Sequence, residues 1–427
     1  MNLKNLQIPK IISSELLEIT ANVSNRNLLK VVAILEKFAA IKWHHRGFSA
    51  VKQMIKDDHP GIQATRRILQ NANPAARAAV LNNLILGCLL LGYHKRLDFY
   101  NKHGVAPPGT LMISPTLRCN LKCYGCYSGT HDQNQELSYE EVDQILSDAS
   151  DSGTNFIMIL GGEPFMVPWL MDMLEKYPFM AFQIYTNATL IDDEKIDRLA
   201  AMGNVAITVS VDGLREETDE RRGLGNYDKV TSVMRKLSKA GVIVGYSAML
   251  SRKNFHTIYS DEFLDAMIEN GAGYGWVPLT LPQGRACVEP ELILTEDQKK
   301  QIYDMVKDVR ARKPILLMDF YNDAKLTEGC SAGRITIHIN ANGDVEPCVL
   351  MPFAKDNIRE KSFVDILRSD FFEGLRDINT QYCKETQTCM WVFKPKDVLN
   401  VINTCGVKAT SEGVLDRLNE LAKTQQE

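Results

Sequence analysis

Two different spacings of hydrophobic residues divide the chain. Over residues 1–105 apolar positions recur every three to four residues, as in residues 28–38, which is typical of amphipathic helices. Pro74 opens a further apolar run that continues to Leu91. A stretch rich in glycine and proline, residues 103–109, then indicates a linker. We therefore expect a helical N-terminal region over residues 1–105.

Short apolar segments alternate with amphipathic stretches over the next part of the chain. The candidate strands are residues 111–115, 155–160, 182–186, 205–211, 242–249 and 274–279. The helical patterns between them are residues 138–150, 192–201, 227–240 and 261–270. Such repetition predicts an α/β fold with a parallel sheet, either doubly wound or curled into an incomplete barrel. In both cases ligands gather at the carboxyl ends of the strands.

The pattern changes again after the sixth candidate strand. A long helix is expected over residues 295–312, and residues 335–339 alternate as a strand. Asn342-Gly343 is a strong hairpin-turn signal after that strand. Further helices are expected at residues 362–378 and 411–423. The predicted organisation is thus a helical region (1–105), a partial barrel (106–290) and a small C-terminal domain with helices (291–427).

Charge and composition narrow the classes of function. The formal net charge of the 427 residues is −4, which gives no electrostatic case for binding nucleic acid. The N-terminus lacks the order of a secretory leader, and the most apolar stretch, residues 84–92, is too short to span a bilayer. We expect a buried helix there, with an interfacial membrane helix as the alternative. The ten cysteines are then in a reducing cytoplasm, where grouped cysteines indicate metal or redox chemistry.

Three cysteines follow the first candidate strand at close spacing. Cys119, Cys123 and Cys126 form a C-x3-C-x2-C loop. A structural zinc site normally needs four ligands, and the nearest further candidate is His131. Three thiolates suit a 4Fe–4S cluster that leaves one iron open to an exogenous ligand. We predict that these cysteines hold such a cluster and are the catalytic centre.

This loop resembles that of the radical S-adenosylmethionine (AdoMet) superfamily. The resemblance implies that the open iron is chelated by AdoMet, whose reductive cleavage yields a 5′-deoxyadenosyl radical that abstracts hydrogen from a substrate. It also implies an incomplete (β/α)6 barrel, in accord with the strand pattern. The reductant implied is a protein such as flavodoxin or ferredoxin.

Further motifs of the family occur in order at the expected strand ends. Gly161-Gly162-Glu163-Pro164 resembles the motif that holds the AdoMet amino group, and a carboxylate suits an ammonium partner. The segment around Asn187 resembles the TNGTL turn of the family. By the same resemblance, the remaining candidate AdoMet contacts are Ser210, Asp212, Arg222, Ser247 and Val277.

The arginine and the aromatic residue that would contact AdoMet each have more than one candidate in the sequence. The segment Asp219-Glu-Arg221-Arg222-Gly223 resembles one whose arginine pairs with the AdoMet carboxylate, and guanidinium geometry suits that role. Of the adjacent arginines, we favour Arg222. Many family members have an aromatic residue directly before the third cysteine, where this chain has Gly125. Tyr124 is the candidate cofactor contact beside it.

A second group of cysteines lies near the C-terminus. Cys330, Gly343 and Cys348 resemble the first half of the SPASM or twitch extension, which houses auxiliary iron–sulfur clusters. Some cysteines of a full SPASM segment are missing, so the resemblance implies one auxiliary 4Fe–4S cluster. Cys389 is the expected third ligand. The fourth is Cys383, Cys405 or an open position, with Cys383 favoured by its short spacing.

Several functions remain open from the sequence. The SPASM likeness favours a peptide or protein side chain as substrate, whereas the apolar N-terminal region leaves room for a lipid or another hydrophobic small molecule. A non-catalytic iron–sulfur protein for electron transfer or redox sensing is the alternative from another class, and a zinc-stapled binding module is a third. We expect no nucleic-acid partner and do not favour membrane contact.

Overall fold

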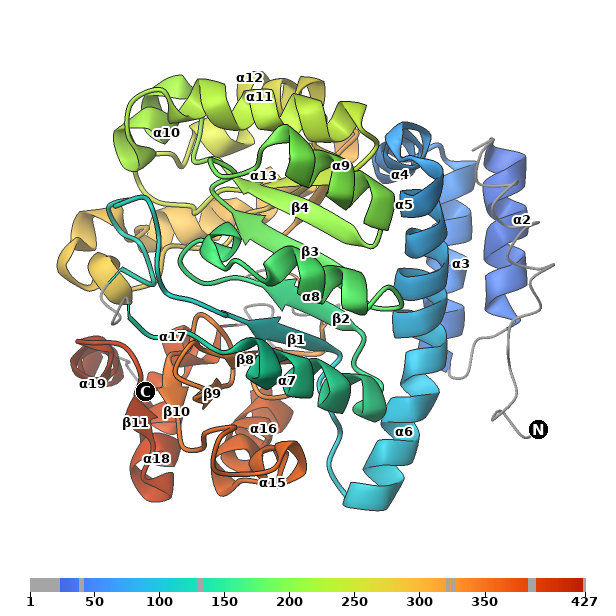
Figure 1. Ribbon diagram of the computed structural model, residues 1–427. Helices are drawn as coiled ribbons and strands as arrows, with labels where there is room; N and C mark the ends of the chain where they lie inside the picture. Colours follow the sequence, from blue (N-terminus) through green and yellow to red (C-terminus); the bar gives the residue numbers. More distant parts are fainter. Residues whose placement is uncertain are drawn as a thin grey trace.

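A curved parallel sheet with helices outside it forms the centre of the molecule (Figure 1). The structure is a computed structural model and describes residues 24–37, 42–129, 134–319, 323, 327–382 and 389–424. The sheet has nine strands in the order β7-β6-β5-β4-β3-β2-β1-β8-β9. Strands β1 to β8 run parallel, and only β9 is antiparallel to its neighbour β8. The predicted α/β fold with an incomplete TIM-like barrel is confirmed.

The strands of this sheet are short. They are β1 (Thr110–Ile113), β2 (Phe156–Ile159), β3 (Ala181–Thr186), β4 (Val205–Ser210), β5 (Ile243–Ser247), β6 (Tyr274–Trp276), β7 (Leu316–Met318), β8 (Thr336–Ile339) and β9 (Val345–Glu346). The six predicted strands of the barrel are β1 to β6. A separate two-stranded sheet pairs β10 (Phe353–Ala354) with β11 (Lys408–Ala409).

Helical segments follow the strands, and the longer ones pack on the outer face of the sheet. The segments are α7 (Tyr139–Ser152), η3 (Pro164–Met166), α8 (Leu170–Lys176), α9 (Asp193–Met202), α10 (Arg215–Arg222), α11 (Asn226–Lys239), η4 (Thr257–Tyr259), α12 (Asp261–Glu269), η5 (Gly284–Val288), η6 (Pro290–Leu292) and α13 (Glu296–Arg312). The short η5 lies at the barrel mouth. Polar caps fix where several of the helices begin. Ser138 and Glu141 form a capping box at α7, and Asp192 caps α9.

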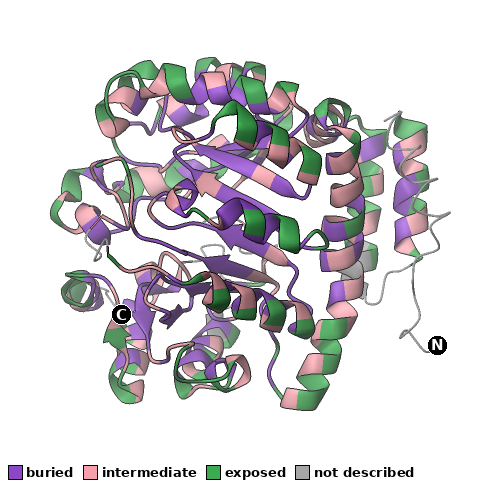
Figure 2. Ribbon diagram, in the orientation of Figure 1, coloured by how far each residue is buried: buried purple, intermediate pink, exposed green. Residues whose placement is uncertain are grey.

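Alternation along each strand separates two apolar layers. In β3, Phe182 and Ile184 join the large core beneath the outer helices, whereas Tyr185 packs with the residues inside the barrel. In β1, Leu111 and Ile113 face the helices and Met112 faces inward. The strands are therefore buried on both faces, as Figure 2 shows.

The N-terminal helices cover the end of the barrel where the strands begin (Figure 1). They are α2 (Asn25–Glu36), α3 (Lys42–Lys56), α4 (Pro60–Asn71), α5 (Pro74–Ala79), η2 (Val80–Leu91) and α6 (Gly92–His103). Arg67 donates to the carbonyl oxygens of Ile268, Ala272 and Pro314, at 3.0, 2.8 and 3.0 Å. Asn73 and Arg96 likewise donate to carbonyl oxygens in the loops before β5 and β2. The described helices of this region thus close the end of the barrel opposite the cysteine loop, whereas residues 1–23 and 38–41 of the predicted helical region lie outside the described residues.

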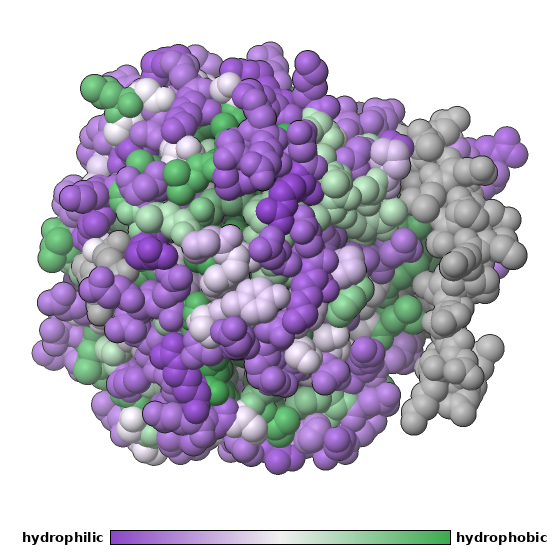
Figure 3. Space-filling view, in the orientation of Figure 1, coloured by the Kyte–Doolittle hydropathy of each residue, from purple (hydrophilic) through white to green (hydrophobic). Residues whose placement is uncertain are grey.

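The apolar stretch at residues 84–92 belongs to a longer helical run. From Pro74 to His103 the chain is continuously helical and, by length and composition alone, apolar enough to cross a membrane. This differs from the sequence expectation, which considered only the nine-residue stretch. Hydrophobic side chains reach the surface beside this column of helices (Figure 3). Asn83 nevertheless donates to the carbonyl oxygens of Pro178 and Met180, so the helix packs on the barrel. A single run of this kind is weak support for a membrane span.

The C-terminal region both completes the sheet and packs beside it. The predicted hairpin is β8 and β9, and Gly343 lies in its turn with φ +80°. Its first strand pairs with β1 and so extends the barrel sheet. The helices that follow are α15 (Phe363–Leu367), α16 (Asp370–Tyr382), α17 (Met390–Phe393), α18 (Pro395–Cys405) and α19 (Val414–Thr424).

Candidate active site

The loop that follows β1 carries Cys119, Cys123 and Cys126 into a cavity of about 250 Å³ at the carboxyl ends of the strands. Two backbone hydrogen bonds tie the start of this loop to the glycine motif after β2. The Gly162 amide donates to the Thr116 carbonyl at 2.9 Å, and the Glu163 amide donates to the Arg118 carbonyl at 2.8 Å. A Cβ atom at Gly162 would lie 2.1 Å from the Arg118 carbonyl oxygen, so only glycine fits there. The glycine motif therefore holds the cysteine loop in place.

A second segment supports the loop from the other side. The Arg285 amide donates to the Cys126 carbonyl at 3.0 Å, and the Arg285 guanidinium donates to the Cys123 carbonyl at 2.7 Å. Arg285 lies in η5, just after β6 and its loop. The cysteine loop is thus held by hydrogen bonds from the glycine motif and from Arg285.

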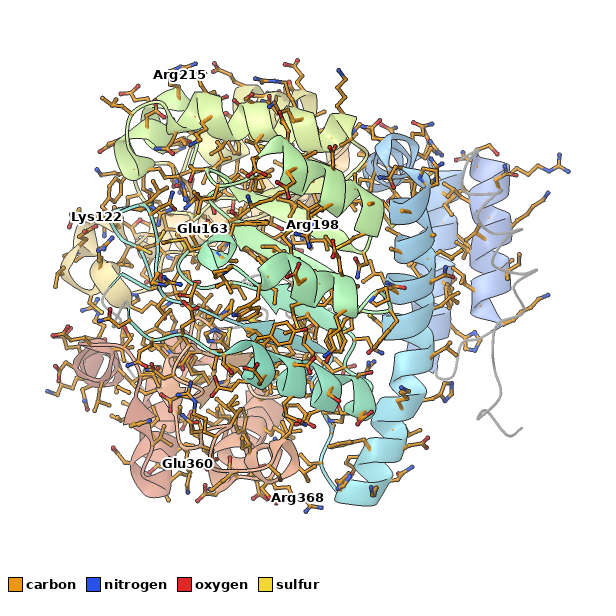
Figure 4. All side chains as sticks on the ribbon, viewed as in Figure 1. Lys122, Glu163, Arg198, Arg215, Glu360 and Arg368 are labelled. Atoms are coloured by element: carbon orange, nitrogen blue, oxygen red, sulfur yellow. The ribbon has the colours of Figure 1, made fainter. Side chains whose placement is uncertain are left out.

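Glu163 is buried at the end of β2, on the same side of the sheet as the cysteine loop (Figure 4). Its carboxylate accepts hydrogen bonds from the Thr186 hydroxyl at 2.7 Å, the Asn187 amide at 2.8 Å and the Phe165 amide at 3.1 Å. Burial raises the pKa of Glu163 above its ordinary value despite these bonds. The side chain thus links the glycine motif to the turn after β3.

Asp212 forms the centre of a buried charge cluster after β4. It accepts hydrogen bonds from the Arg221 guanidinium at 2.7 Å and from the Arg222 Nε at 2.6 Å. Burial alone would raise the pKa of Asp212, but the two arginines outweigh it and hold this pKa below its ordinary value. The cluster keeps both guanidinium groups at the cavity wall, where Arg221 and Arg222 line it.

The structure brings most of the sequence-predicted AdoMet contacts to this one cavity. Those that line it are Gly161, Gly162, Asn187, Ser210, Arg222 and Ser247. Glu163, Asp212 and Val277 are buried behind the lining. Tyr124 lies outside it, with the Lys253 ammonium 4.6 Å from its ring centre. The aromatic residue of the cysteine loop that does line the cavity is Tyr127.

Five lining residues come from inward positions of the strands and the loops that follow them. They are Met112, Met158, Leu160, Tyr185 and Trp276. The sequence motifs do not point to these residues, because an apolar residue in a strand can face either the helices or the barrel interior. Strict alternation from known outward positions could have identified them.

The second group of cysteines lines the same cavity from the C-terminal region. Cys330, Cys348 and Cys389 all contribute to its wall. Cys405, in contrast, lies at the end of α18 and does not line the cavity. Cys383, the favoured fourth ligand, lies outside the described residues. Both cysteine groups therefore open into one chamber.

The cysteine environments fit iron–sulfur clusters. The Leu121 amide donates to Cys119 Sγ at 3.4 Å, and the Leu350 amide donates to Cys348 Sγ at 3.5 Å. Such hydrogen bonds to sulfur are a feature of iron–sulfur sites. Burial raises the pKa of Cys119 to about 11 and that of Cys348 to about 12, so binding iron must displace protons from these thiols.

A single zinc ion fits these residues less well. Within the described part of the chain, no three His, Cys, Asp or Glu side chains converge closely enough to hold one metal ion. In a four-iron cluster each thiolate binds a different iron, so the sulfur atoms stand farther apart. The arrangement accordingly favours clusters over a zinc staple.

Comparison with known proteins agrees with the geometry. Residues 113–264 match the model of the Radical SAM superfamily, and residues 330–390 match an iron–sulfur cluster-binding domain, SPASM. The chain belongs to the radical SAM superfamily. A Radical SAM domain implies a 4Fe–4S cluster and AdoMet as cofactors, and a SPASM domain implies auxiliary iron–sulfur binding.

Individual relatives of this radical SAM protein differ in what they act on. Mycofactocin maturase MftC of Mycobacterium tuberculosis is 30% identical over 59% of this chain and 66% of its own length. An AdoMet-dependent heme synthase of Methanosarcina barkeri is 25% identical over 63% of this chain and 85% of its own length. The chain thus spans just under two thirds of the maturase.

A solved structure supports the fold of this radical SAM protein. SuiB of Streptococcus suis, bound to precursor peptide SuiA, superposes with a TM-score of 0.54 at 22% identity. The match covers 67% of this chain and 71% of SuiB.

Proposed function

We propose that this protein cleaves AdoMet reductively at a 4Fe–4S cluster held by Cys119, Cys123 and Cys126, and abstracts hydrogen from a peptide or protein side chain. The observation that carries the proposal is the single cavity that joins these cysteines to the glycine and arginine motifs. When bound, the cluster supplies the electron that breaks the carbon–sulfur bond of AdoMet.

The chain's own residues bind and orient the cofactor in this proposal. Gly161 and Gly162 leave room for close approach at the end of β2. Arg222 offers its remaining guanidinium N–H groups to the AdoMet carboxylate, and Ser210 offers a hydroxyl to the ribose. The apolar inner face of the barrel keeps water from the reacting carbon.

A peptide substrate is favoured by the relatives with maturation roles. SuiB was solved with a precursor peptide, and MftC is named as a maturase. A hydrophobic small molecule is the second candidate, because the heme synthase matches over most of its own length and the cavity floor is apolar. We place the enzyme in the cytoplasm, in line with described cysteines that form no disulfides with one another. The proposed reductant is flavodoxin or ferredoxin.

The first test is formation of 5′-deoxyadenosine. Anaerobically reconstituted protein, given dithionite and AdoMet, is expected to release it, and chromatography of the quenched mixture measures the yield. Protein that carries its full iron content yet releases none would refute the proposal. Adding candidate precursor peptides or hydrophobic metabolites then separates the substrate classes, since the true substrate accelerates cleavage and loses a hydrogen atom.

Replacing Glu163 by glutamine tests the cofactor site. We expect AdoMet binding to weaken about ten- to hundredfold. The substitution removes the charge-assisted hydrogen bond from the AdoMet ammonium to the Glu163 carboxylate, which is worth about 1.5–3 kcal/mol. Equilibrium binding of AdoMet to the reconstituted protein measures this, with the cluster absorbance as a check on loading. Glu175→Gln is the matched control, since Glu175 pairs with Arg198 on the surface of α8. Unchanged affinity in Glu163→Gln would leave Glu163 as a support of the turn after β3 only.

A further inference from the structure

The floor of the cavity is uncharged and built from inward strand positions. Met112, Met158 and Leu160 form part of it, beside the rings of Tyr185 and Trp276. These two rings meet edge to face, with centroids 6.2 Å apart and planes at 71°. Edge-to-face rings and thioether sulfurs both favour an aromatic neighbour. Among the described lining residues, the charged side chains are Arg221 and Arg222, which Asp212 holds at the wall after β4.

Tyr185 brings a hydroxyl to this floor. Its oxygen accepts a hydrogen bond from the side-chain Nε2 of Gln183 at 3.3 Å. Gln183 donates its other amide hydrogen to the Thr208 hydroxyl at 2.9 Å, and Thr208 in turn bonds to the Tyr274 hydroxyl at 2.8 Å. This network fixes Tyr185 from below the cavity.

A glycine on β5 makes room for the network. A Cβ atom at Gly245 would lie 2.2 Å from the Tyr274 ring, so a side chain at this position would displace that ring. Tyr274 does not line the cavity, whereas Tyr185 does. The two tyrosines therefore share one network but differ in their access to a ligand.

The phenolic proton of Tyr185 is uncommitted within the described part of the chain. Its oxygen serves as the acceptor toward Gln183, and the structure gives no acceptor for its own hydrogen. Burial, with smaller effects of Tyr274 and Tyr127, raises the pKa of Tyr185 well above its ordinary value. The hydroxyl is thus a neutral donor on a side chain that lines the cavity.

We propose that Tyr185 is a specificity-determining residue. It would donate a hydrogen bond to an acceptor oxygen on an uncharged aromatic group of the substrate, which packs between Met112, Met158 and Trp276. The inference deepens the proposed function, on which it rests for the identity of this cavity as the reaction chamber. A charged group packed between these apolar side chains would carry a desolvation cost.

Small aromatic probes test the subsite without knowledge of the substrate. Acetophenone and ethylbenzene have similar shapes, but only acetophenone carries an acceptor oxygen. Equilibrium dialysis against the reconstituted protein gives the ratio of their affinities. We expect Tyr185→Phe to lower the preference for acetophenone about fivefold, the value of one net hydrogen bond. Ethylbenzene binding should change less than twofold.

Tyr274→Phe is the matched control, because it removes a phenol from the same network without changing the cavity lining. It should leave the ratio unchanged. An unchanged ratio in Tyr185→Phe, an equal loss in Tyr274→Phe, or no binding of either probe to the wild-type protein would each overturn the inference. Release of 5′-deoxyadenosine by Tyr185→Phe without substrate is measured in parallel. Its absence in wild type and variant alike would refute the proposed function, while the probe ratios still decide the subsite.

Discussion

A variant with alanine at Cys119, Cys123 and Cys126 is expected to release no 5′-deoxyadenosine. In the proposed function these three thiolates are the protein ligands of the cluster at the mouth of the barrel, so their loss removes that cluster. Iron content should fall from about eight to about four atoms per chain, because one of two 4Fe–4S clusters is lost. Colorimetric iron analysis and chromatography of the reaction mixture measure both effects. Residual 5′-deoxyadenosine above the protein-free background would contradict the assignment.

The complementary variant separates the two clusters. Cys330→Ala with Cys348→Ala should also leave about four irons, but the remaining cluster should still respond to AdoMet in its electron paramagnetic resonance spectrum. A value near four irons per chain in the wild-type protein would instead mean that the protein holds only one cluster. Single alanine variants at Cys383 and Cys405 then identify the fourth ligand by loss of iron. If neither single variant loses iron, the result would favour an auxiliary cluster with one open iron that faces the chamber.

Replacing Asp212 by asparagine should destabilise the fold strongly. The change leaves Arg221 and Arg222 buried without their shared carboxylate, and breaking a buried ion pair from one side costs about 3–5 kcal/mol. Denaturant unfolding of the cluster-free protein measures the loss. Asp228→Asn is the control, because Asp228 pairs with Arg215 on the surface, where a pair contributes about 0–1 kcal/mol. Equal effects of the two substitutions would contradict the buried cluster.

The pH dependence of unfolding should report the same cluster. The folded-state pKa of Asp212 lies below its unfolded value, so its stabilising contribution is fully present above that unfolded pKa. It is lost progressively as the pH falls through the folded value. Asp212→Asn should therefore flatten the acid limb of the stability curve relative to the wild-type protein. An acid limb that is unchanged in the variant would mean that Asp212 is not its source.

The barrel was predictable because alternating segments and polar caps mark its elements locally. Every end of the six predicted barrel strands lies within three residues of its observed bound, and the hairpin at Gly343 follows from its turn chemistry. Which strands pair with one another in the sheet was not predictable in the same way. Strand β7 has only three residues after a long helix, and nothing in the alternation of β8 states that it pairs with β1.

Site residues were predictable where a motif directly follows a strand. They were not predictable where their role depends on which side chains contact one another in the folded protein. The cysteine loop and the glycine motif occur in order, so their convergence follows from a parallel sheet. The sharing of Asp212 by two arginines could not be read from spacing, because both arginines precede the same glycine. The role of Tyr185 depends on a glycine in another strand and on a cross-strand hydrogen bond.

The pairing of β1 with β8 has a consequence for how the protein is made. One side of β1 meets β2 soon after synthesis, but the other side waits for a strand from near the far end of the chain. Contacts between distant segments form slowly, and an unpaired parallel edge invites association with other chains. On the ribosome, the strand that leads into the radical-cluster loop therefore stays open on this side until β8 has emerged. Truncation before β8 should therefore yield an aggregating barrel rather than a smaller working enzyme, because one side of β1 would stay unpaired.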